Sequence, residues 1–457
     1  MPGVTTRYWC EWALLGGEAA EPDVLLEVRD GRYTSVVPAT PAPPGALRLP
    51  GLALPGLANA HSHAFHRALR GRSGGSGGDF WTWRERMYAV AERLDPDTYH
   101  RLARAVYAEM ALAGITAVGE FHYLHHGPGG TRYADPNAMS AALVAAAADA
   151  GIRITLLDTC YLSGGIDAEG RHQPLEGVQR RFGDGDAERW AERVAAFRPE
   201  GEHVRVGTAA HSVRAVPDHE LRRFTALHRQ AGWAGRPAHI HVSEQPAENL
   251  TCLTRYDRTP VQLLADTGLL DELAPTLVHA THLGRSDVAL IRQATAVICL
   301  CPTTERELAD GLPSTGELFD AHPVVVGSDG NSTIDLFEEV RGVEAHERLR
   351  TGRRGNFTAP ALLAGVFGSG HDDALGWPDA GALAPGNRAD LVVLDLDGVR
   401  MAGADPARAA DAVLSAATAA DVREVMADGR WIVRDGVHQR LADVPGALRA
   451  AVREVMP

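Results

Sequence analysis

The stretch LPGLANAHSH, residues 54 to 63, decides the fold of this 457-residue chain. An apolar run meets a Pro-Gly break and then ends in two histidines, His61 and His63, spaced two residues apart. In an extended strand, residues i and i+2 point to the same face, so both imidazoles can reach one metal ion. The chain has 20 histidines, so such a pair also arises by chance, and its meaning depends on the rest of the sequence.

The same pattern, a short apolar run that ends in polar residues, recurs along the chain, and amphipathic stretches lie between many of the runs. The runs cover residues 52–55, 116–118, 152–157, 204–207, 238–242, 276–278, 296–300 and 323–326. The predicted helices cover residues 95–113, 136–150, 217–231, 286–294 and 334–350. Eight apolar strands that alternate with helices predict an α/β fold, a (β/α)₈ TIM-like barrel with enlarged loops.

A doubly wound open sheet is the alternative fold. It lacks support because no GxGxxG motif follows the first strand. The glycine-rich stretch 71–78 is interpreted as a flexible loop, since no Lys-Ser/Thr ends it as in a phosphate-binding loop.

The two ends of the chain share a different pattern. Residues 1–53 and 383–457 contain short apolar runs separated by turn residues, and Asp428-Gly429 between two such runs is a hairpin signal. We predict that both ends pair into one small β-sandwich domain, and that residues 54–382 form the barrel.

Composition excludes several classes of protein. The formal charge of −14 argues against a nucleic-acid partner. No apolar stretch approaches the roughly 20 residues of a membrane helix, and residues 1–17 do not resemble a signal peptide. Five sparse cysteines fit a reduced cytoplasm, and Cys299-Leu300-Cys301 lacks a partner pair and is interpreted as strand packing. We therefore expect a cytoplasmic protein that acts on a small molecule.

The chain contains no lysine, and all 45 basic residues are arginine. Schiff-base catalysis and a Walker-type phosphate lysine are therefore excluded. A carboxylated lysine bridging two metals is excluded as well, so we expect any metal centre to be mononuclear.

Potential metal ligands stand where the predicted strands end, which is the face where barrel enzymes carry their chemistry. These residues are His61, His63, His241, Glu244, His279 and Asp329. Imidazole and carboxylate are zinc ligands, and Fe²⁺ or another divalent ion accepts the same donors. Taken singly, each residue has a structural alternative, and Asp329 could cap the helix predicted at 334–350.

A family resemblance rests on these residues and on longer segments around them. The segments are PGLANAHSHAF (55–65), FWTWRE (80–85), EFHYLHH (120–126), HSVRAV (211–216), HIHVSEQ (239–245), CPTTE (301–305) and Ser328-Asp329. The set resembles the amidohydrolase superfamily and, within it, the formiminoglutamate deiminases of histidine degradation. FWTWRE and EFHYLHH are the specific part, whereas the HxH pair and the aspartate serve many substrates.

The resemblance implies hydrolysis of N-formimino-L-glutamate to N-formyl-L-glutamate and ammonia by a homodimer with one Zn²⁺ per subunit. It implies that the zinc and a water are held by His61, His63, His241 and Asp329. It implies that His279 and Asp329 accept protons and that Glu244 donates one. The implied substrate contacts are His66, Arg84, Tyr123, His211 and Arg214, and arginine suits the two carboxylates of a glutamate tail.

Two positions depart from the family pattern and bear on substrate choice. His66 stands where many members have glutamine, and Gly330-Asn331 follows Asp329 where others often have Ser-His. One alternative is a related mononuclear enzyme that deaminates a cyclic amidine such as guanine or another heterocycle. A second alternative is a non-catalytic scaffold, which predicts the loss of a metal ligand, and none is missing from the sequence.

Overall fold

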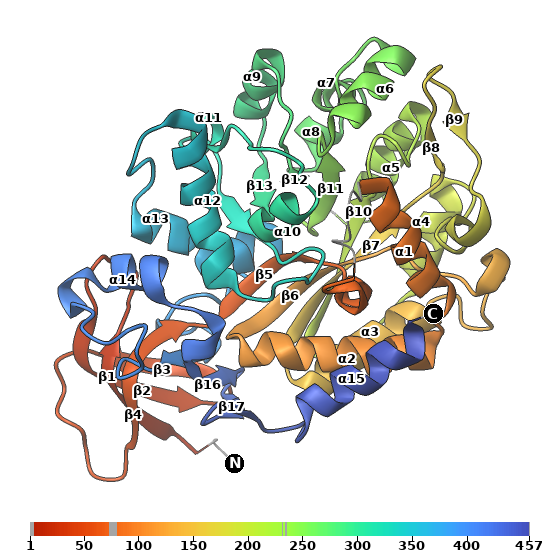
Figure 1. Cartoon of the computed structure of the whole chain (residues 1–457). Coiled ribbons are helices and arrows are strands. Elements are labelled where there is room, and N and C mark those ends of the chain that lie inside the picture. The colour runs from red at the N-terminus through yellow and green to blue at the C-terminus, as the bar shows by residue number, and fades with distance from the viewer. Residues whose placement is uncertain (1–3, 73–79, 231, 234, 457) are drawn as a thin grey trace.

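A computed structural model describes residues 4–72, 80–230, 232–233 and 235–456 (Figure 1). The side chains of Phe80 and Trp81 are not described, and most of the predicted loop at 71–78 lies outside the described residues.

In the described part of the chain, eight parallel strands form one curved sheet (Figure 1). In sheet order they are β5 (Leu57–Ser62), β6 (Ile115–His122), β7 (Arg153–Cys160), β10 (Val204–Ala210), β11 (Ala238–Val242), β12 (Thr276–His279), β13 (Val297–Leu300) and β14 (Val324–Val326). Seven of these strands are buried along their whole length, and only β10 has partly exposed residues. Strands covered on both faces read as continuous apolar runs, which explains the pattern in the sequence.

The sheet closes where β5 meets the segment after β14, so the barrel prediction is confirmed and the open-sheet alternative is wrong. The Asp329 N–H donates to the His61 carbonyl at 2.9 Å, and the His63 N–H donates to the Asp329 carbonyl at 3.0 Å. Gly327 allows this close approach, because a Cβ there would lie 2.6 Å from the Cβ of His61. We call this contact between the end of β5 and the segment after β14 the seam. It fixes the backbones of three predicted metal ligands, His61, His63 and Asp329, against one another.

Helices surround the barrel and connect its strands (Figure 1). They are α1 (Phe80–Glu92), α2 (Pro96–Leu112), α3 (Ala138–Ala150), α4 (Ala187–Ala196), α5 (Asp218–Gln230), α6 (Pro246–Tyr256), α7 (Pro260–Asp266), α8 (Leu269–Glu272), α9 (Arg285–Gln293), α10 (Pro302–Glu307), α11 (Thr315–Leu318), α12 (Leu336–Thr351), α13 (Ala359–Ala364), α14 (Ala409–Ala416) and α15 (Val444–Val455). None of these helices, as far as the chain is described, is long and apolar enough to cross a membrane.

Side-chain caps set two of the predicted helix starts. The Asp95 carboxylate accepts the Thr98 N–H at 2.8 Å and begins α2 where the sequence predicts a helix. The Asp335 carboxylate accepts the N–H groups of Phe337 and Glu338 and begins α12. Asp329 is therefore not the cap of this helix, and its carboxylate is left for another role.

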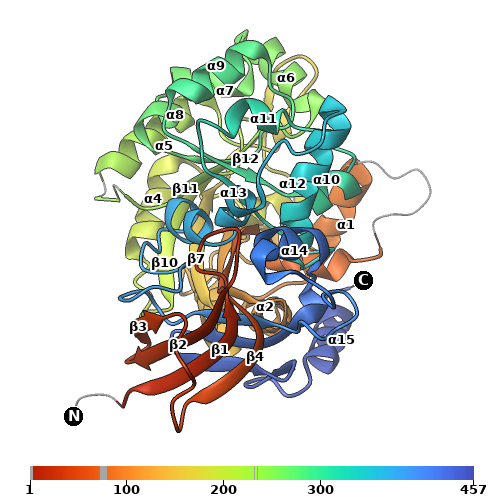
Figure 2. The same ribbon diagram turned by 90° about the vertical axis from the view of Figure 1, so that its left-hand side faces the viewer.

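Both chain ends contribute to a second sheet, as predicted. Its order is β18 (Val437–His438), β17 (Arg430–Arg434), β16 (Val422–Ala427), β15 (Leu391–Leu394), β4 (Leu47–Pro55), β1 (Thr6–Ala13), β2 (Glu21–Arg29) and β3 (Arg32–Val37). Figure 2 shows the red N-terminal strands and the blue C-terminal strands together at one end of the molecule. The antiparallel pair of β4 and β15 joins the two ends. The boundaries at 53/54 and 382/383 stay a prediction.

The first predicted barrel strand is wrong. Residues 52–55 form the end of β4 in the second sheet, and the barrel begins with β5, just after Gly56. A Cβ at Gly56 would lie 2.7 Å from Thr116 Cγ2 and 2.8 Å from Asp390 Cβ, so this joint is too tight for a side chain. The Pro-Gly break thus separates two strands of different sheets, although the apolar pattern runs through it.

Candidate active site

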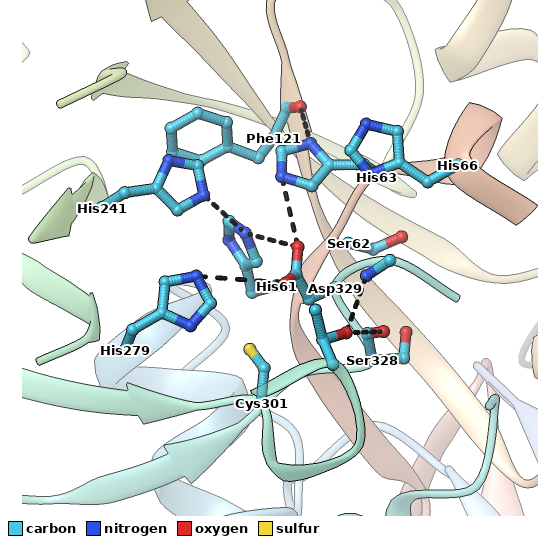
Figure 3. Close-up of polar contacts among 12 residues, drawn as sticks. His61, Ser62, His63, His66, Phe121, His241, His279, Cys301, Ser328 and Asp329 are labelled. Atoms are coloured by element: carbon cyan, nitrogen blue, oxygen red, sulfur yellow. Dashed lines mark hydrogen bonds and ion pairs between the residues drawn. The ribbon is translucent and has the colours of Figure 1, made fainter. Parts of the chain in front are cut away.

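Four of the predicted metal ligands meet at the carboxyl ends of the barrel strands (Figure 3). His61, His63, His241 and Asp329 are all buried, and each offers a ligand atom within 4.8 Å of the others. His61 Nε2 and His63 Nε2 lie 3.5 Å and 3.4 Å from Asp329 Oδ1. His241 Nε2 lies 3.1 Å from His61 Nε2. Three imidazoles and one carboxylate therefore converge on a common point.

Backbone carbonyls orient two of these imidazoles. His63 Nδ1 lies 2.9 Å from the Phe121 carbonyl oxygen, and His241 Nδ1 lies 3.0 Å from the His211 carbonyl oxygen. A carbonyl only accepts hydrogen bonds, so each Nδ1 carries the proton and each Nε2 turns a lone pair toward the cluster. Burial lowers the pKa of His61 to about 3 and also lowers the pKa of His63. These neutral nitrogens, with one carboxylate oxygen, fit a divalent cation.

An amide network supports the seam beneath this cluster. Asn331 Nδ2 lies 2.9 Å from the His63 carbonyl oxygen, 3.1 Å from the Asp329 carbonyl oxygen and 3.1 Å from Ser62 Oγ. The Ser328 hydroxyl donates to Asn331 Oδ1 at 2.7 Å. Asn331, one of the departures from the family pattern, is fully buried, and its hydrogen bonds support the backbone of the predicted metal ligands.

Asn59 extends the same network from β5. Its side-chain amide donates to Ser328 Oγ at 2.7 Å, and its side-chain oxygen accepts the Ser328 N–H at 2.9 Å. Both residues belong to segments that carry the family resemblance, but the sequence alone indicates no role for them. The structure places both of them across the seam.

His279 lies beside the cluster among carboxylates. Its Nε2 is 3.9 Å from both Glu244 Oε1 and Asp329 Oδ2, and its Nδ1 is 3.4 Å from Glu305 Oε1. Burial alone would lower the pKa of His279, but the three carboxylates outweigh burial and raise that pKa well above its usual value. His279 and Asp329 also adopt left-handed backbone conformations, with φ of 72° and 41°, which are uncommon outside glycine. His279 and the three carboxylates around it are suited to holding and moving protons.

Glu305 is a residue that the sequence reasoning missed. Its carboxylate faces His279 and also accepts the Cys301 N–H at 2.8 Å, and the side chain is buried. The signal was present, because Glu305 ends the CPTTE segment that follows strand β13.

A cavity opens over the cluster. All five predicted substrate contacts line it, together with His63, His241, His279, Glu244 and Asp329; the five are His66, Arg84, Tyr123, His211 and Arg214. His66 Nε2 lies 3.0 Å from the Tyr123 hydroxyl, whereas His66 Nδ1 is buried and has no hydrogen-bond partner among the described residues. The His66 side chain thus lines the cavity with one hydrogen bond already made to Tyr123.

Arg84 and Arg214 also line a second cavity, so they lie at the boundary between the two cavities. The Arg84 guanidinium lies 5.6 Å from the centre of the Tyr88 ring. Arg214 Nη2 lies 3.3 Å from Glu244 Oε2, and Arg214 Nε lies 3.4 Å from Glu248 Oε2. Glu248, also missed from the sequence, is buried and helps to orient Arg214.

The class of protein follows from comparison with known families. Residues 52–432 match the amidohydrolase family, and the chain belongs to this family of hydrolases. The resemblance seen in the sequence is thereby confirmed.

Two relatives and one solved structure are similar over most of the chain. The chain is 39% identical to the formimidoylglutamate deiminase of Pseudomonas aeruginosa over 406 residues, which covers 86% of this chain and 87% of that protein. It is 30% identical to the 8-oxoguanine deaminase of the same organism over 430 residues, 91% of each chain. The crystal structure of an amidohydrolase from Brucella melitensis is similar with a TM-score of 0.87 at 32% identity, covering 99% of this chain and 100% of that one.

Proposed function

We propose that this chain converts N-formimino-L-glutamate and water to N-formyl-L-glutamate and ammonia. One observation carries the proposal: two arginines suited to a dicarboxylate tail line the same cavity as three of the four candidate metal ligands, His63, His241 and Asp329. The relative at 39% identity, a formimidoylglutamate deiminase, supports the same substrate.

We infer that the cation is Zn²⁺, held by His61, His63, His241 and Asp329. The donor set of three neutral imidazoles and one carboxylate supports zinc, although Fe²⁺ accepts the same atoms. When bound, the cation would make a water molecule acidic enough to act as a nucleophile near neutral pH.

Proton transfer falls to three side chains. His279 Nε2 and Asp329 Oδ2, 3.9 Å apart, would accept protons from the attacking water, because a cation bound beside His279 would lower the pKa that the carboxylates raise in its absence. Glu244, on the other side of His279, would protonate the imino nitrogen and make the formimino carbon more electrophilic. Asp329 would then pass a proton to the departing nitrogen. The formimino carbon gains one oxygen from water, loses the imino nitrogen as ammonia and keeps its bond to the glutamate nitrogen.

The rest of the cavity would hold the glutamate tail. Arg84 and Arg214 would bind its two carboxylates, and His66, Tyr123 and His211 would add hydrogen bonds. Because the whole chain carries a formal charge of −14, these local cations have to outweigh a repulsive long-range field. Arg214 also contacts Glu244, so one guanidinium would bind the substrate tail and contact the proposed proton donor.

Ammonia release from a panel of substrates tests the proposal. The panel is formimino-L-glutamate, formimino-L-aspartate, guanine, 8-oxoguanine and cytosine. We expect ammonia from formimino-L-glutamate, with metal content of one zinc per chain. The relative at 30% identity supports the alternative of a cyclic amidine, but a heterocycle offers no carboxylate to the arginines. Ammonia from a heterocycle and none from formiminoglutamate would contradict the proposal.

We further propose that the enzyme acts as a homodimer in the cytoplasm. All five cysteines are free and buried, which supports a reducing compartment. The dimer rests on the family resemblance, and light scattering of the purified protein measures it directly.

A further inference from the structure

A second group of potential ligands lies beside the first. A sulfur of Cys301, a nitrogen of His279 and an oxygen of Asp329 lie within 4.8 Å of one another, and all three residues are buried. Figure 3 shows the Cys301 sulfur directed toward the space between His279 and His61. The three side chains come from the ends of β12, β13 and β14, which are neighbours in the barrel. Cys301 also packs with Cys299 in the apolar core of the barrel, as the sequence predicted.

We propose that Cys301, His279 and Asp329 form a second cation site, which takes a thiophilic divalent ion such as Cd²⁺, Co²⁺ or excess Zn²⁺ and inhibits the enzyme. Thiolate and imidazole ligands select ions of this kind over Mg²⁺ and Ca²⁺, which prefer oxygen. On coordination, the Cys301 thiol loses its proton to solvent and binds as thiolate, with no change of oxidation state.

The two oxygens of Asp329 allow the two sites to coexist. Its Oδ1 lies 3.5 Å and 3.4 Å from the Nε2 atoms of His61 and His63, whereas its Oδ2 lies 3.9 Å from His279 Nε2. One carboxylate can therefore serve one cation with each oxygen. Two-metal sites in hydrolases place their ions about 3.5–4 Å apart, a spacing that a bridging carboxylate permits. The absence of lysine removes one bridging group, but Asp329 offers another.

Occupation of this site would stop turnover through His279. The proposed function uses a free imidazole there to move protons, and coordination of that imidazole by a cation removes it from proton transfer. The site itself rests on the positions of the three side chains and does not depend on which amidine the enzyme hydrolyses.

Burial keeps the Cys301 thiol from other chemistry. It raises the pKa of this thiol well above its usual value, so the uncoordinated group is a protonated thiol and a poor nucleophile. Cys299, two residues earlier on β13, is equally buried but does not belong to the ligand group found among the described residues. Because its side chain interacts with that of Cys301, Cys299→Ala is a control for the loss of a neighbouring thiol rather than of a ligand.

The test starts from protein loaded with one zinc per chain and adds Co²⁺ or Cd²⁺. The readouts are bound metal by mass spectrometry and the ultraviolet charge-transfer band of a metal-thiolate bond. We expect one further equivalent and the band in the wild type and in Cys299→Ala. We expect neither in Cys301→Ser and Cys301→Ala, which should retain the first zinc. Thermal melting of each variant identifies any that fails to fold.

Inhibition provides the second readout. We expect the second equivalent to abolish ammonia release, and the inhibitory concentration to rise at least about tenfold in Cys301→Ser, measured against the uninhibited rate of that variant. Absence of the band in the wild type, or a second equivalent bound equally by Cys301→Ser, would overturn the site. If the enzyme released no ammonia from formiminoglutamate, the charge-transfer band and the metal stoichiometry would still show whether the second cation site exists. Failure of the proposed function can therefore be distinguished from failure of this site.

Discussion

The side-chain amide of Asn331 lies 2.9 Å from the backbone carbonyl oxygen of His63 and joins the two strands that close the barrel. His63 and Asp329 supply two of the four candidate metal ligands, and the same amide also lies 3.1 Å from the Asp329 carbonyl oxygen. Metal binding and barrel closure are therefore linked through one buried side chain.

We predict that Asn331→Ala weakens zinc binding. Loss of the amide leaves the carbonyls of His63 and Asp329 without this partner and loosens the ligand positions, and supporting contacts of this kind contribute about 10- to 100-fold in metal affinity. Competition with a chelator measures the effect. Asn356→Ala, which removes an amide that donates to the Arg353 carbonyl on a surface loop, is the control. A folded Asn331→Ala protein with wild-type zinc affinity would show that the seam does not support the metal.

His279→Asn should keep the metal and lose most of its turnover. The asparagine cannot accept a proton as imidazole does, and positioned acid-base groups contribute about 10²- to 10⁴-fold in rate. Zinc content by mass spectrometry and kcat for ammonia release are measured on the same preparation. If His279→Asn loses the zinc instead, the division between ligand and proton acceptor is wrong.

His66→Gln should keep kcat/KM close to that of the wild type, whereas His66→Leu should lower it about 30-fold. Glutamine restores the residue found in many family members and can bond both Tyr123 and the substrate, so kcat/KM should stay within about tenfold of the wild type. Leucine removes both hydrogen bonds, and each buried bond contributes about 1 kcal/mol. A His66→Leu enzyme with unchanged kcat/KM would remove this residue from the substrate site.

Arg84→Gln should lower kcat/KM for formimino-L-glutamate by about 10- to 100-fold, because a hydrogen bond to a charged group contributes about 1.5–3 kcal/mol. Arg86→Gln is a matched control, since Arg86 is exposed on the same helix, α1. Equal effects of the two substitutions would indicate a general loss of positive charge rather than a specific contact.

Stability of the metal-free protein should fall as pH decreases from 6.5 toward 4. Burial lowers the pKa of His371 from 6.5 to about 4, and Nε2 of this residue donates to the Gly56 carbonyl at 3.0 Å. The folded state therefore binds fewer protons than the unfolded state in this range. The stability that the neutral imidazole contributes is present above pH 6.5 and is lost as pH falls through the folded pKa.

Thermal unfolding of chelator-treated protein at pH 8.0, 6.5 and 5.0 measures this effect. These pH values lie above, at and below the reference pKa of histidine, about 6.5. His371→Gln should reduce the pH dependence without abolishing it, because His122 and His239 have similarly lowered pKa values, whereas His219→Gln should not change it, because the His219 side chain is 74% exposed. A flat profile in the wild type would contradict the prediction.

Local pattern was enough to predict the residues at the strand ends. His61, His63, His241 and Asp329 each lie near or just beyond the end of an apolar run, and parallel strands bring such ends to one face. The boundary between two strands was harder to predict where the apolar pattern continues through both of them. Residues 52–55 are as apolar as β5, so nothing local shows that they belong to another sheet.

Roles that depend on contacts between distant segments could not be predicted. Asn331 resembles a turn residue in the sequence, and its partner His63 is 268 positions away. Glu305 sits in the polar segment TTERE at the start of a helix, where an exposed carboxylate is the ordinary expectation. Only the fold places these side chains against the ligands.

The position of the seam has a consequence for biosynthesis. The first ligands leave the ribosome early, but the last strand of the barrel and its aspartate follow more than half the chain later. A nascent polypeptide that ends before β14 has no Asp329 and no Asn331, so it lacks both the fourth ligand and the amide that holds His63. The complete set of four candidate ligands therefore exists only once translation has passed the end of the barrel.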